Sequence, residues 1–344
     1  MLDKQRFIWL LCWGFIISLC FACGVKQDSL NSIAAENLFL PPRQDFRIVV
    51  ISDLNGQYGS TEYEPEVKQA IALMPRWQPD LVLGGGDAIA GQKKSLTKSQ
   101  INAMWQAFDR HVAAPLRQQK IPFAFTIGNH DGSGAIKDGN LVFEGERKLA
   151  KAYWNKYRER LGLNFVDLAN FPFYYSFQQN NIFFLVWDAS THNISPQQLA
   201  WVKQTLNSDV ARQAKTRIAI GHLPLYPIAA EKNKSGEYLA KGDEMRSLLE
   251  QNRVQVYISG HHHVYYPGKK EGLELLHAGA LGQGTRQLIN SNLLPYPTVT
   301  VIDLDPTSKL TYTTYNAKTW ELVALEQLPS SITGEHGTIL RRDL

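Results

Sequence analysis

Carboxylate, amide and imidazole side chains follow a series of short apolar runs in this sequence, at the point where each run ends. These side chains are Asp53, Asp87, Asn129, His222, His261 and His263. Buried charges are costly unless they are paired or bound to a metal ion, so a group of this composition needs a reason. Nitrogen and oxygen ligands without a thiolate suit Zn, Mn, Fe or similar ions, and a carboxylate can bridge two of them. The residue types therefore predict a metal site.

The apolar runs themselves are rich in β-branched and aromatic residues and are bounded by turn residues, which indicates buried strands. They lie at 47–52, 80–85, 123–128, 182–188, 217–222 and 254–260. Apolar residues at helical spacing predict helices at 95–120, 146–161, 196–207 and 242–252. The carboxyl ends of the strands in an α/β sheet line one crevice, where residues far apart in the sequence converge. The sequence therefore predicts an α/β fold with the metal site at that edge.

The last third of the chain changes character, because strand-like runs follow one another there without helices. These runs lie at 273–280, 298–305, 309–316 and 321–327. Such a series predicts either a second sheet or antiparallel additions to the first. The segment from Pro329 onward is polar, and we expect it to be a loosely held tail.

Five short motifs stand in order along the chain. They are Asp53-Leu54-Asn55, Gly86-Asp87, Gly128-Asn129-His130-Asp131, Gly221-His222 and Gly260-His261-His262-His263. In order and strand context they resemble the D-x-H, G-D, G-N-H-D/E, G/x-H and G-H-x-H motifs of the calcineurin-like metallophosphoesterase superfamily, over about residues 46 to 285. The resemblance implies a four-layer αββα sandwich of two mixed β-sheets. It also implies hydrolysis of phosphate esters at two divalent or trivalent metal ions, such as Mn, Zn or Fe.

The resemblance assigns a role to each matching residue. Asp53 and His263 would bind the first metal ion, and Asp87 would bridge both ions. The side chains assigned to the second ion are Asn129, His222 and His261. His130 would not be a ligand; its counterparts lie near the leaving-group oxygen and act as a general acid or stabilise the transition state, a role worth about 10² to 10⁴ in rate.

Two departures from the family pattern bear on function. Asn55 replaces the His of D-x-H, and an amide oxygen is a poorer partner for zinc than imidazole, although it can still ligate a hard cation. Asn55 is a candidate ligand of the first ion, and we therefore expect that site to be weaker, selective for a different metal, or filled partly by water. The segment 88–91 lacks the Asp and Arg of protein Ser/Thr phosphatases, which argues against a protein substrate. It also lacks the metal-binding Tyr of purple acid phosphatases, which argues against an iron site with a charge-transfer colour.

The N-terminus predicts export. Two basic residues precede an apolar run at 7–22, as in a signal peptide, and the run is a little shorter than the roughly 20 residues of a membrane-spanning helix. Cys23 follows Ala22 in a context that resembles the lipobox of bacterial lipoproteins, so lipidation of Cys23, simple cleavage and an uncleaved anchor are all open. We expect a periplasmic or cell-surface protein held at the membrane.

Composition limits the partners. The net charge is +4 and no run of five Lys or Arg occurs, so charge does not predict nucleic-acid binding. The three cysteines all lie within residues 1–23, so neither a disulfide nor a zinc–thiolate site is expected in the body of the protein. The expected organisation is a signal peptide or anchor at 1–23, a tether at 24–45, a metallophosphoesterase domain at 46–328 and a polar tail at 329–344.

The predicted function is hydrolysis of a small-molecule phosphate ester, with a monoester slightly favoured because an exported enzyme could scavenge phosphate. The alternatives are a phosphodiesterase, or a non-catalytic metal-binding surface protein in which Asn55 marks the loss of activity. Loops at 132–146, 228–241 and 283–297 would determine the substrate. We expect His262 to be structural, because side chains in an extended run point alternately to opposite faces.

Overall fold

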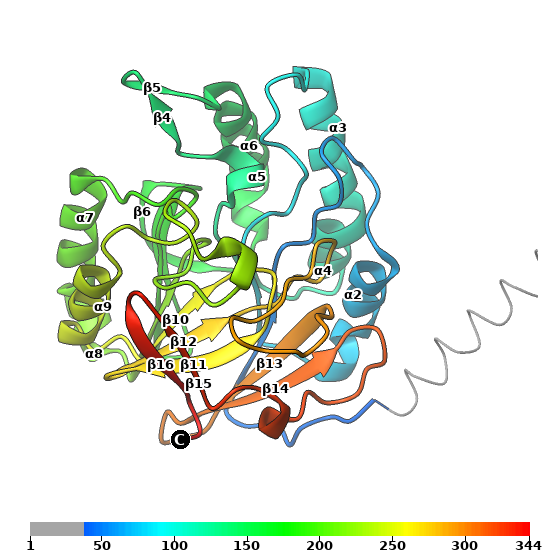
Figure 1. Cartoon of the computed structure of the whole chain (residues 1–344). Helices are drawn as coiled ribbons and strands as arrows, with labels where there is room; N and C mark the ends of the chain where they lie inside the picture. Colours follow the sequence, from blue (N-terminus) through cyan, green and yellow to red (C-terminus); the bar gives the residue numbers. More distant parts are fainter. Residues whose placement is uncertain (1–37) are drawn as a thin grey trace, which may run out of the picture.

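The computed structural model describes residues 38–344, so the predicted signal peptide, Cys23 and most of the tether lie outside the described residues. Two mixed β-sheets form the centre of the molecule (Figure 1). The first holds, in spatial order, β14 (Leu310–Asn316), β13 (Thr298–Leu304), β1 (Phe46–Ile51), β2 (Leu81–Gly84) and β3 (Phe123–Phe125). The second holds β15 (Ser331–Gly334), β16 (Gly337–Arg341), β11 (Tyr266–Lys270), β12 (Leu273–His277), β10 (Val256–Ser259), β9 (Thr216–Ile220), β8 (Ile182–Val186), β7 (Tyr174–Gln179) and β6 (Asn164–Asn170).

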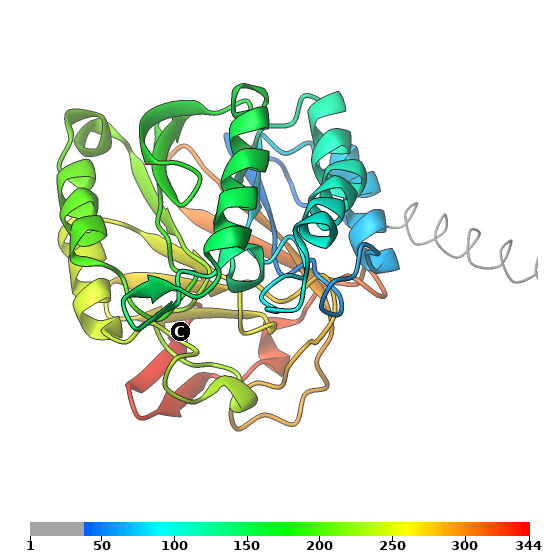
Figure 2. The same cartoon turned by 90° about the horizontal axis from the view of Figure 1, so that it is seen from above.

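Helices flank the two sheets on opposite sides (Figure 2), which confirms the predicted four-layer αββα sandwich. In sequence order they are α2 (Pro65–Trp77), α3 (Lys98–Phe108), α4 (Ala114–Gln118), α5 (Asn129–Gly132), α6 (Glu144–Tyr157), α7 (Pro196–Leu206), α8 (Asp209–Gln213) and α9 (Gly242–Gln251). A small hairpin, β4 (Ile136–Lys137) and β5 (Asn140–Leu141), follows α5 and precedes α6 in the sequence, and it projects to one side of both helices in Figure 1. In Figure 2 the yellow-green helices α7, α8 and α9 lie on one flank, and the blue, cyan and green helices α2, α3, α4 and α6 lie on the other.

The apolar runs form the parallel centre of each sheet. β1, β2 and β3 are parallel neighbours, and so are β8, β9, β10 and β12. The side chains of β1, β2, β8, β9 and β10 are buried along their whole length, because helices cover one face and the other sheet covers the opposite face. This burial explains why the runs are continuously apolar rather than alternating.

Three local predictions need correction. The helix expected at 95–120 is interrupted by a π turn at Asp109–Ala113, and Pro115, which lacks an amide hydrogen, lies in the first turn of the helix that follows. The strand expected at 321–327 is absent among the described residues; only an isolated bridge at Leu322 and a 3-10 turn at Leu325–Gln327 form there. The apolar side chains of that segment are half-exposed, so too little burial favours a strand.

The expectation of a loosely held tail after Pro329 is also wrong. β15 and β16 form a hairpin that extends the second sheet at β11, with Gly268 opposite Arg341. Ile332 and Ile339 lie opposite each other and are buried, at 2% and 3% exposure. The polar residues that suggested a tail occupy the other face of this edge hairpin.

A buried ion pair joins β1 to β13. Arg47 Nε and one terminal nitrogen donate to the two oxygens of Asp303 at 2.9 and 3.0 Å, and both side chains are less than 5% exposed. We expect Asp303→Ala to lower the free energy of unfolding by about 3–5 kcal/mol, because the guanidinium would stay buried without its counter-charge. Urea unfolding measures this loss. The double variant Arg47→Met/Asp303→Leu should recover much of it, and a loss below 1 kcal/mol in the single variant would contradict the estimate.

Between residues 38 and 344, the structure contains no helix that is both long enough and apolar enough to cross a bilayer.

Candidate metal centre

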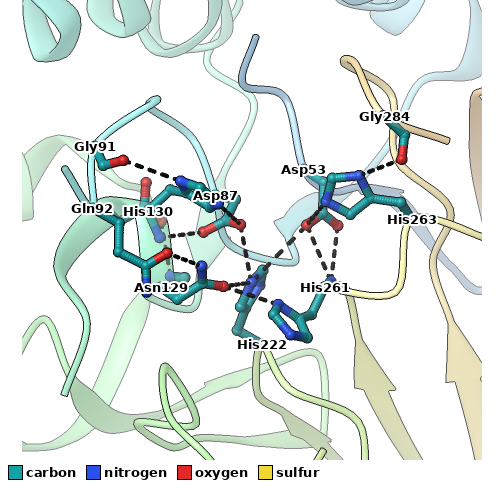
Figure 3. A network of polar contacts seen from close by, with 12 residues as sticks. Asp53, Asp87, Gly91, Gln92, Asn129, His130, His222, His261, His263 and Gly284 are labelled. Atoms are coloured by element: carbon teal, nitrogen blue, oxygen red, sulfur yellow. Dashed lines mark hydrogen bonds and ion pairs between the residues drawn. The ribbon is translucent and has the colours of Figure 1, made fainter. Parts of the chain in front are cut away.

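All six side chains that the sequence singled out meet at one edge of the two sheets (Figure 3). Three follow strands of the first sheet, namely Asp53, Asp87 and Asn129, and three follow strands of the second, namely His222, His261 and His263. Five of them are at most 8% exposed, and the sixth, His263, has a side chain that is 12% exposed. The carboxyl ends of β1, β2, β3, β9 and β10 therefore build one compact polar cluster at the boundary between the sheets.

One group within the cluster surrounds the side-chain oxygen of Asn129. His222 Nε2 and His261 Nδ1 each lie 2.9 Å from Asn129 Oδ1, and His222 Nε2 lies 3.2 Å from Asp87 Oδ2. The other ring nitrogen of His222 is 2.8 Å from the carbonyl oxygen of Gly85, which only an N–H can satisfy. In a neutral ring the Nε2 lone pair would therefore point at two oxygens, an arrangement that either a proton on Nε2 or a bound metal ion relieves.

The charges at this group reinforce that reading. Oδ2 of Asp87 is buried, and in the described part of the chain no donor other than His222 Nε2, at 3.2 Å, lies within hydrogen-bonding distance of it. Burial alone would raise the pKa of Asp87, but His222 and His130 lower it below its usual range. Burial alone would lower the pKa of His222, but Asp87 raises it to about 9. A carboxylate and several imidazole nitrogens with converging lone pairs fit a divalent metal ion.

The other group, at the residues assigned to the first ion, contains Asp53, Asp87 and His263, whose potential ligand atoms lie within 4.8 Å of one another. His263 Nε2 is 3.2 Å from Asp53 Oδ1, while its Nδ1 is 2.9 Å from the carbonyl oxygen of Gly284. That second contact again fixes which nitrogen carries the hydrogen. Asp87 belongs to both groups, so its carboxylate stands where a bridge between two ions would be.

Asn55 lies beside the group of Asp53, Asp87 and His263. Its side chain is buried, its amide N donates to the carbonyl oxygen of Asp87 at 3.2 Å, and its own carbonyl oxygen accepts from Gln283 N at 3.1 Å. The backbone of Asn55 is thus fixed against the loop that carries Asp87.

We expect Asn55→His to raise the affinity of the first site for Zn²⁺ by about tenfold, which is about 1.4 kcal/mol, because imidazole binds zinc better than an amide oxygen. Calorimetric titration of the chelated protein measures the change, and Asn55→Ala should lower the affinity. Equal affinities in all three proteins would mean that the side chain at position 55 does not reach the ion.

The backbone at the cluster is unusual. Four of the six residues have a positive φ, namely Asp53 (50°), Asp87 (55°), His261 (66°) and His263 (54°). For residues other than glycine this conformation costs about 1–3 kcal/mol each and is typical of functional sites. Close packing holds it: a Cβ at Gly128 would lie 2.1 Å from Asp87 Oδ1. Only glycine can stand at 128, so the G-N-H-D motif contributes space as well as side chains.

His130 lies at the edge of the cluster and belongs to neither metal-ligand group. Its Nδ1 is 3.1 Å from the carbonyl oxygen of Gly91, and its Nε2 is 3.9 Å from Asp87 Oδ2. The ring is partly exposed, packs against Tyr58 at 5.2 Å between centroids, and lines a cleft next to the cluster. When Nδ1 carries the hydrogen that the carbonyl oxygen of Gly91 accepts, Nε2 faces the carboxylate of Asp87.

A cleft of about 850 Å³ opens beside the cluster and is lined by Asn129, His130 and His261. Its outer walls come from residues 133–136, 190–196 and 232–241. The predicted specificity loops 132–146 and 228–241 therefore contribute, whereas 283–297 contributes only Arg286. The segment 190–196, which contains His192, was not among the predicted specificity loops, because its short polar sequence resembles an ordinary connection.

Several residues in or near the motifs have structural roles. His262 accepts hydrogen bonds from the amides of Ile228 and Ala229 at Nδ1, which confirms that it is structural. Asp131 accepts from two backbone amides and orients the motif loop. Tyr265, Tyr266 and His277 are buried, which leaves them no direct access to the cleft.

Two residues at the cluster escaped sequence reasoning. Gln92 Oε1 accepts a 2.6 Å hydrogen bond from Asn129 Nδ2, which orients the amide oxygen toward the histidines. Glu237 Oε2 lies 2.9 Å from His261 Nε2 and 2.7 Å from Lys232 Nζ. Neither stands in a motif or at a strand end, so only the tertiary structure reveals them.

Comparison with known proteins agrees with this geometry. Residues 46–265 match the family model described as calcineurin-like phosphoesterase. The fold, the order of the motifs and the convergence of their side chains define a metallophosphoesterase, and the chain belongs to the calcineurin-like phosphoesterase family.

Individual relatives are more distant. Purple acid phosphatase 23 of Arabidopsis thaliana is 27% identical over 256 residues, which cover 71% of this chain and 53% of the relative. The chain thus spans about half the length of that curated relative. Purple acid phosphatase PPD1 of yellow lupin shares the fold with a TM-score of 0.60 at 17% identity, covering 83% of this chain and 54% of its own. GAP50 of Plasmodium, described as the anchor in the inner membrane complex, shares it with a TM-score of 0.55 at 15% identity, over 81% and 87% of the two chains.

Proposed function

We propose that this protein hydrolyses phosphate esters at a pair of metal ions held by the two ligand groups. The observation that carries the proposal is Asp87, which belongs to both groups and whose buried Oδ2 faces His222 Nε2 at 3.2 Å with no other donor within hydrogen-bonding distance among the described residues. The first group would use Asp53, Asn55 and His263, and the second Asn129, His222 and His261. Bound metal ions would supply a hydroxide nucleophile at neutral pH and positive charge for the phosphoryl oxygens.

The residues of the chain would complete the reaction. His130, held at Nδ1 by Gly91, would donate a proton from Nε2 to the oxygen of the departing alcohol. The cleft that His130 lines would hold the alcohol portion of a small-molecule ester. The segment 88–91 contains no tyrosine, so we propose a site of Mn, Zn or Fe ions without the tyrosine-to-iron charge transfer that colours purple acid phosphatases.

The test is hydrolysis of nitrophenyl phosphate and bis-nitrophenyl phosphate by the purified protein with Mn, Zn, Fe, Co or Ni. We expect turnover that disappears with a chelator and returns with metal, and faster cleavage of the monoester. Faster cleavage of the diester would make this a phosphodiesterase. Absence of hydrolysis with every metal would contradict the proposal.

A non-catalytic role is the second candidate. GAP50, which shares the fold, is described as an anchor, and Asn55 departs from the D-x-H pattern. Under this alternative the protein would bind metal ions without turnover, at the exported, membrane-held location that we propose from the N-terminal sequence. Metal content measured together with hydrolysis separates the two functions.

A further inference from the structure

Glu237 contacts two consecutive histidines of the G-H-x-H motif by two different groups. Its carboxylate oxygen Oε2 lies 2.9 Å from His261 Nε2, and its carbonyl oxygen lies 2.9 Å from His262 Nε2. The side chains of Glu237 and His261 are 24% and 6% exposed, so their contact is largely shielded from water. Glu237 therefore faces the side of His261 opposite the metal-ligand group.

The ring of His261 has an acceptor at each nitrogen. Nδ1 lies 2.9 Å from Asn129 Oδ1, and Nε2 lies 2.9 Å from the Glu237 carboxylate. A neutral imidazole has one N–H and can donate to only one of them. A carboxylate accepts a stronger hydrogen bond than an amide oxygen does, so the hydrogen goes to Nε2. The Nδ1 lone pair then points toward Asn129, where the other ligand atoms of the second group converge.

We propose that Glu237 is a positioning residue for the second metal site, which fixes the tautomer and orientation of His261 so that Nδ1 is free to bind the ion. This inference rests on the proposed function, which assigns His261 to that ion. An acceptor on the outer nitrogen of a metal-binding histidine raises its basicity and holds its ring, and loss of such a partner typically lowers metal affinity about 10–100-fold.

Neighbouring residues hold both the side chain of Glu237 and the loop that carries it. Lys232 Nζ lies 2.7 Å from the same Oε2 atom and is itself largely buried. It therefore compensates the negative charge of the carboxylate and fixes its orientation. The loop is held independently by His262, through the amides of Ile228 and Ala229 and the carbonyl oxygen of Glu237. Replacing only the side chain of Glu237 leaves these backbone contacts in place, which makes a clean test available.

The experiment is calorimetric titration of Zn²⁺ alone into the full-length protein after chelation, with Glu237→Gln and Glu237→Ala. The matched control is Glu231→Gln, because Glu231 lies on the same loop, pairs with Arg286 and is 64% exposed. We expect one of two sites to weaken by about 10–100-fold in Glu237→Ala. Glu237→Gln should weaken it less, because the amide oxygen still accepts from Nε2–H. The other site and the control should keep wild-type affinity.

A second readout addresses the tautomer itself. Long-range ¹H–¹⁵N correlation should show the Nε2-protonated form of His261 in the wild type and a mixture of tautomers in Glu237→Ala. Wild-type Zn²⁺ affinity at both sites in both variants, or an unchanged tautomer, overturns the inference. If the wild type itself binds Zn²⁺ tightly but hydrolyses no ester, the catalytic proposal fails while the role of Glu237 is still decided by the titration.

Discussion

Asp87→Asn is expected to abolish hydrolysis, with a loss of at least about 10³ in kcat/KM, equivalent to about 4 kcal/mol of transition-state stabilisation. Asp87 is the member common to both ligand groups, and its Oδ2 lies 3.2 Å from His222 Nε2. An amide at this position removes the negative charge from both sites at once. Metal content should therefore fall from two ions per chain toward none, as measured by elemental analysis after dialysis.

The matched control is Asp131→Asn. Asp131 is buried in the same loop region and belongs to neither ligand group. Its two oxygens accept separately from the amides of Ile89 and Gly128, and an asparagine keeps an oxygen for one of the two. This variant should retain both ions. If Asp87→Asn also retained two ions and most of its rate, the bridging assignment would be wrong.

His130→Ala is expected to have the opposite profile, with unchanged metal content and a rate lower by about 10² to 10⁴. His130 belongs to neither ligand group, and its Nδ1 contact with Gly91 leaves Nε2 for the leaving group. The loss should be larger for an alkyl phosphate than for nitrophenyl phosphate, since nitrophenolate departs readily without a proton. Steady-state kinetics on both esters measure the difference.

His192→Ala is the control for His130, because His192 also lines the cleft but belongs to neither ligand group. It should change KM more than kcat. Loss of metal in His130→Ala would show that His130 is a ligand, and an equal rate loss on the two esters would exclude a role in protonating the leaving group.

The central strands and the six clustered side chains could be predicted from the sequence, because both depend on local patterns. A strand buried on both faces must be apolar, and a charged residue directly after it must lie at the edge of the sheet. Asp53 after β1 and His222 after β9 illustrate this rule. The five motifs also indicate which strands are followed by ligand residues and in which order along the chain.

The peripheral elements could not be predicted with the same certainty, because their signals are weak. β6 is largely exposed and alternates irregularly, and β11 contains Pro267 and Gly268, which are uncommon inside strands. The hairpin of β15 and β16 buries few apolar side chains, so its sequence reads as a tail. Each of these elements forms because the neighbouring strand offers hydrogen bonds.

The finer geometry of the site also lies beyond sequence reasoning. No residue type predicts a positive φ at Asp53 or His263, because packing against other segments imposes it. Contacts between Glu237 and His261 join residues that no motif relates. Sequence patterns therefore identify which side chains lie close together. The orientation of these side chains depends on loops that contain no recognisable motif.

The ligand groups draw equally on both sheets, so binding of an ion there would be coupled to folding. The carboxylate of Asp53, on the first sheet, accepts two 3.1 Å hydrogen bonds from the amide of His261, on the second. An ion coordinated across this boundary binds only when the sheets are docked, so it acts as a removable cross-link. By thermodynamic linkage, each ion at 100 times its dissociation constant would add about 2.7 kcal/mol to the unfolding free energy. A chelator should accordingly lower the melting temperature. The stability of the folded protein would then depend on the concentration of free metal ions around it.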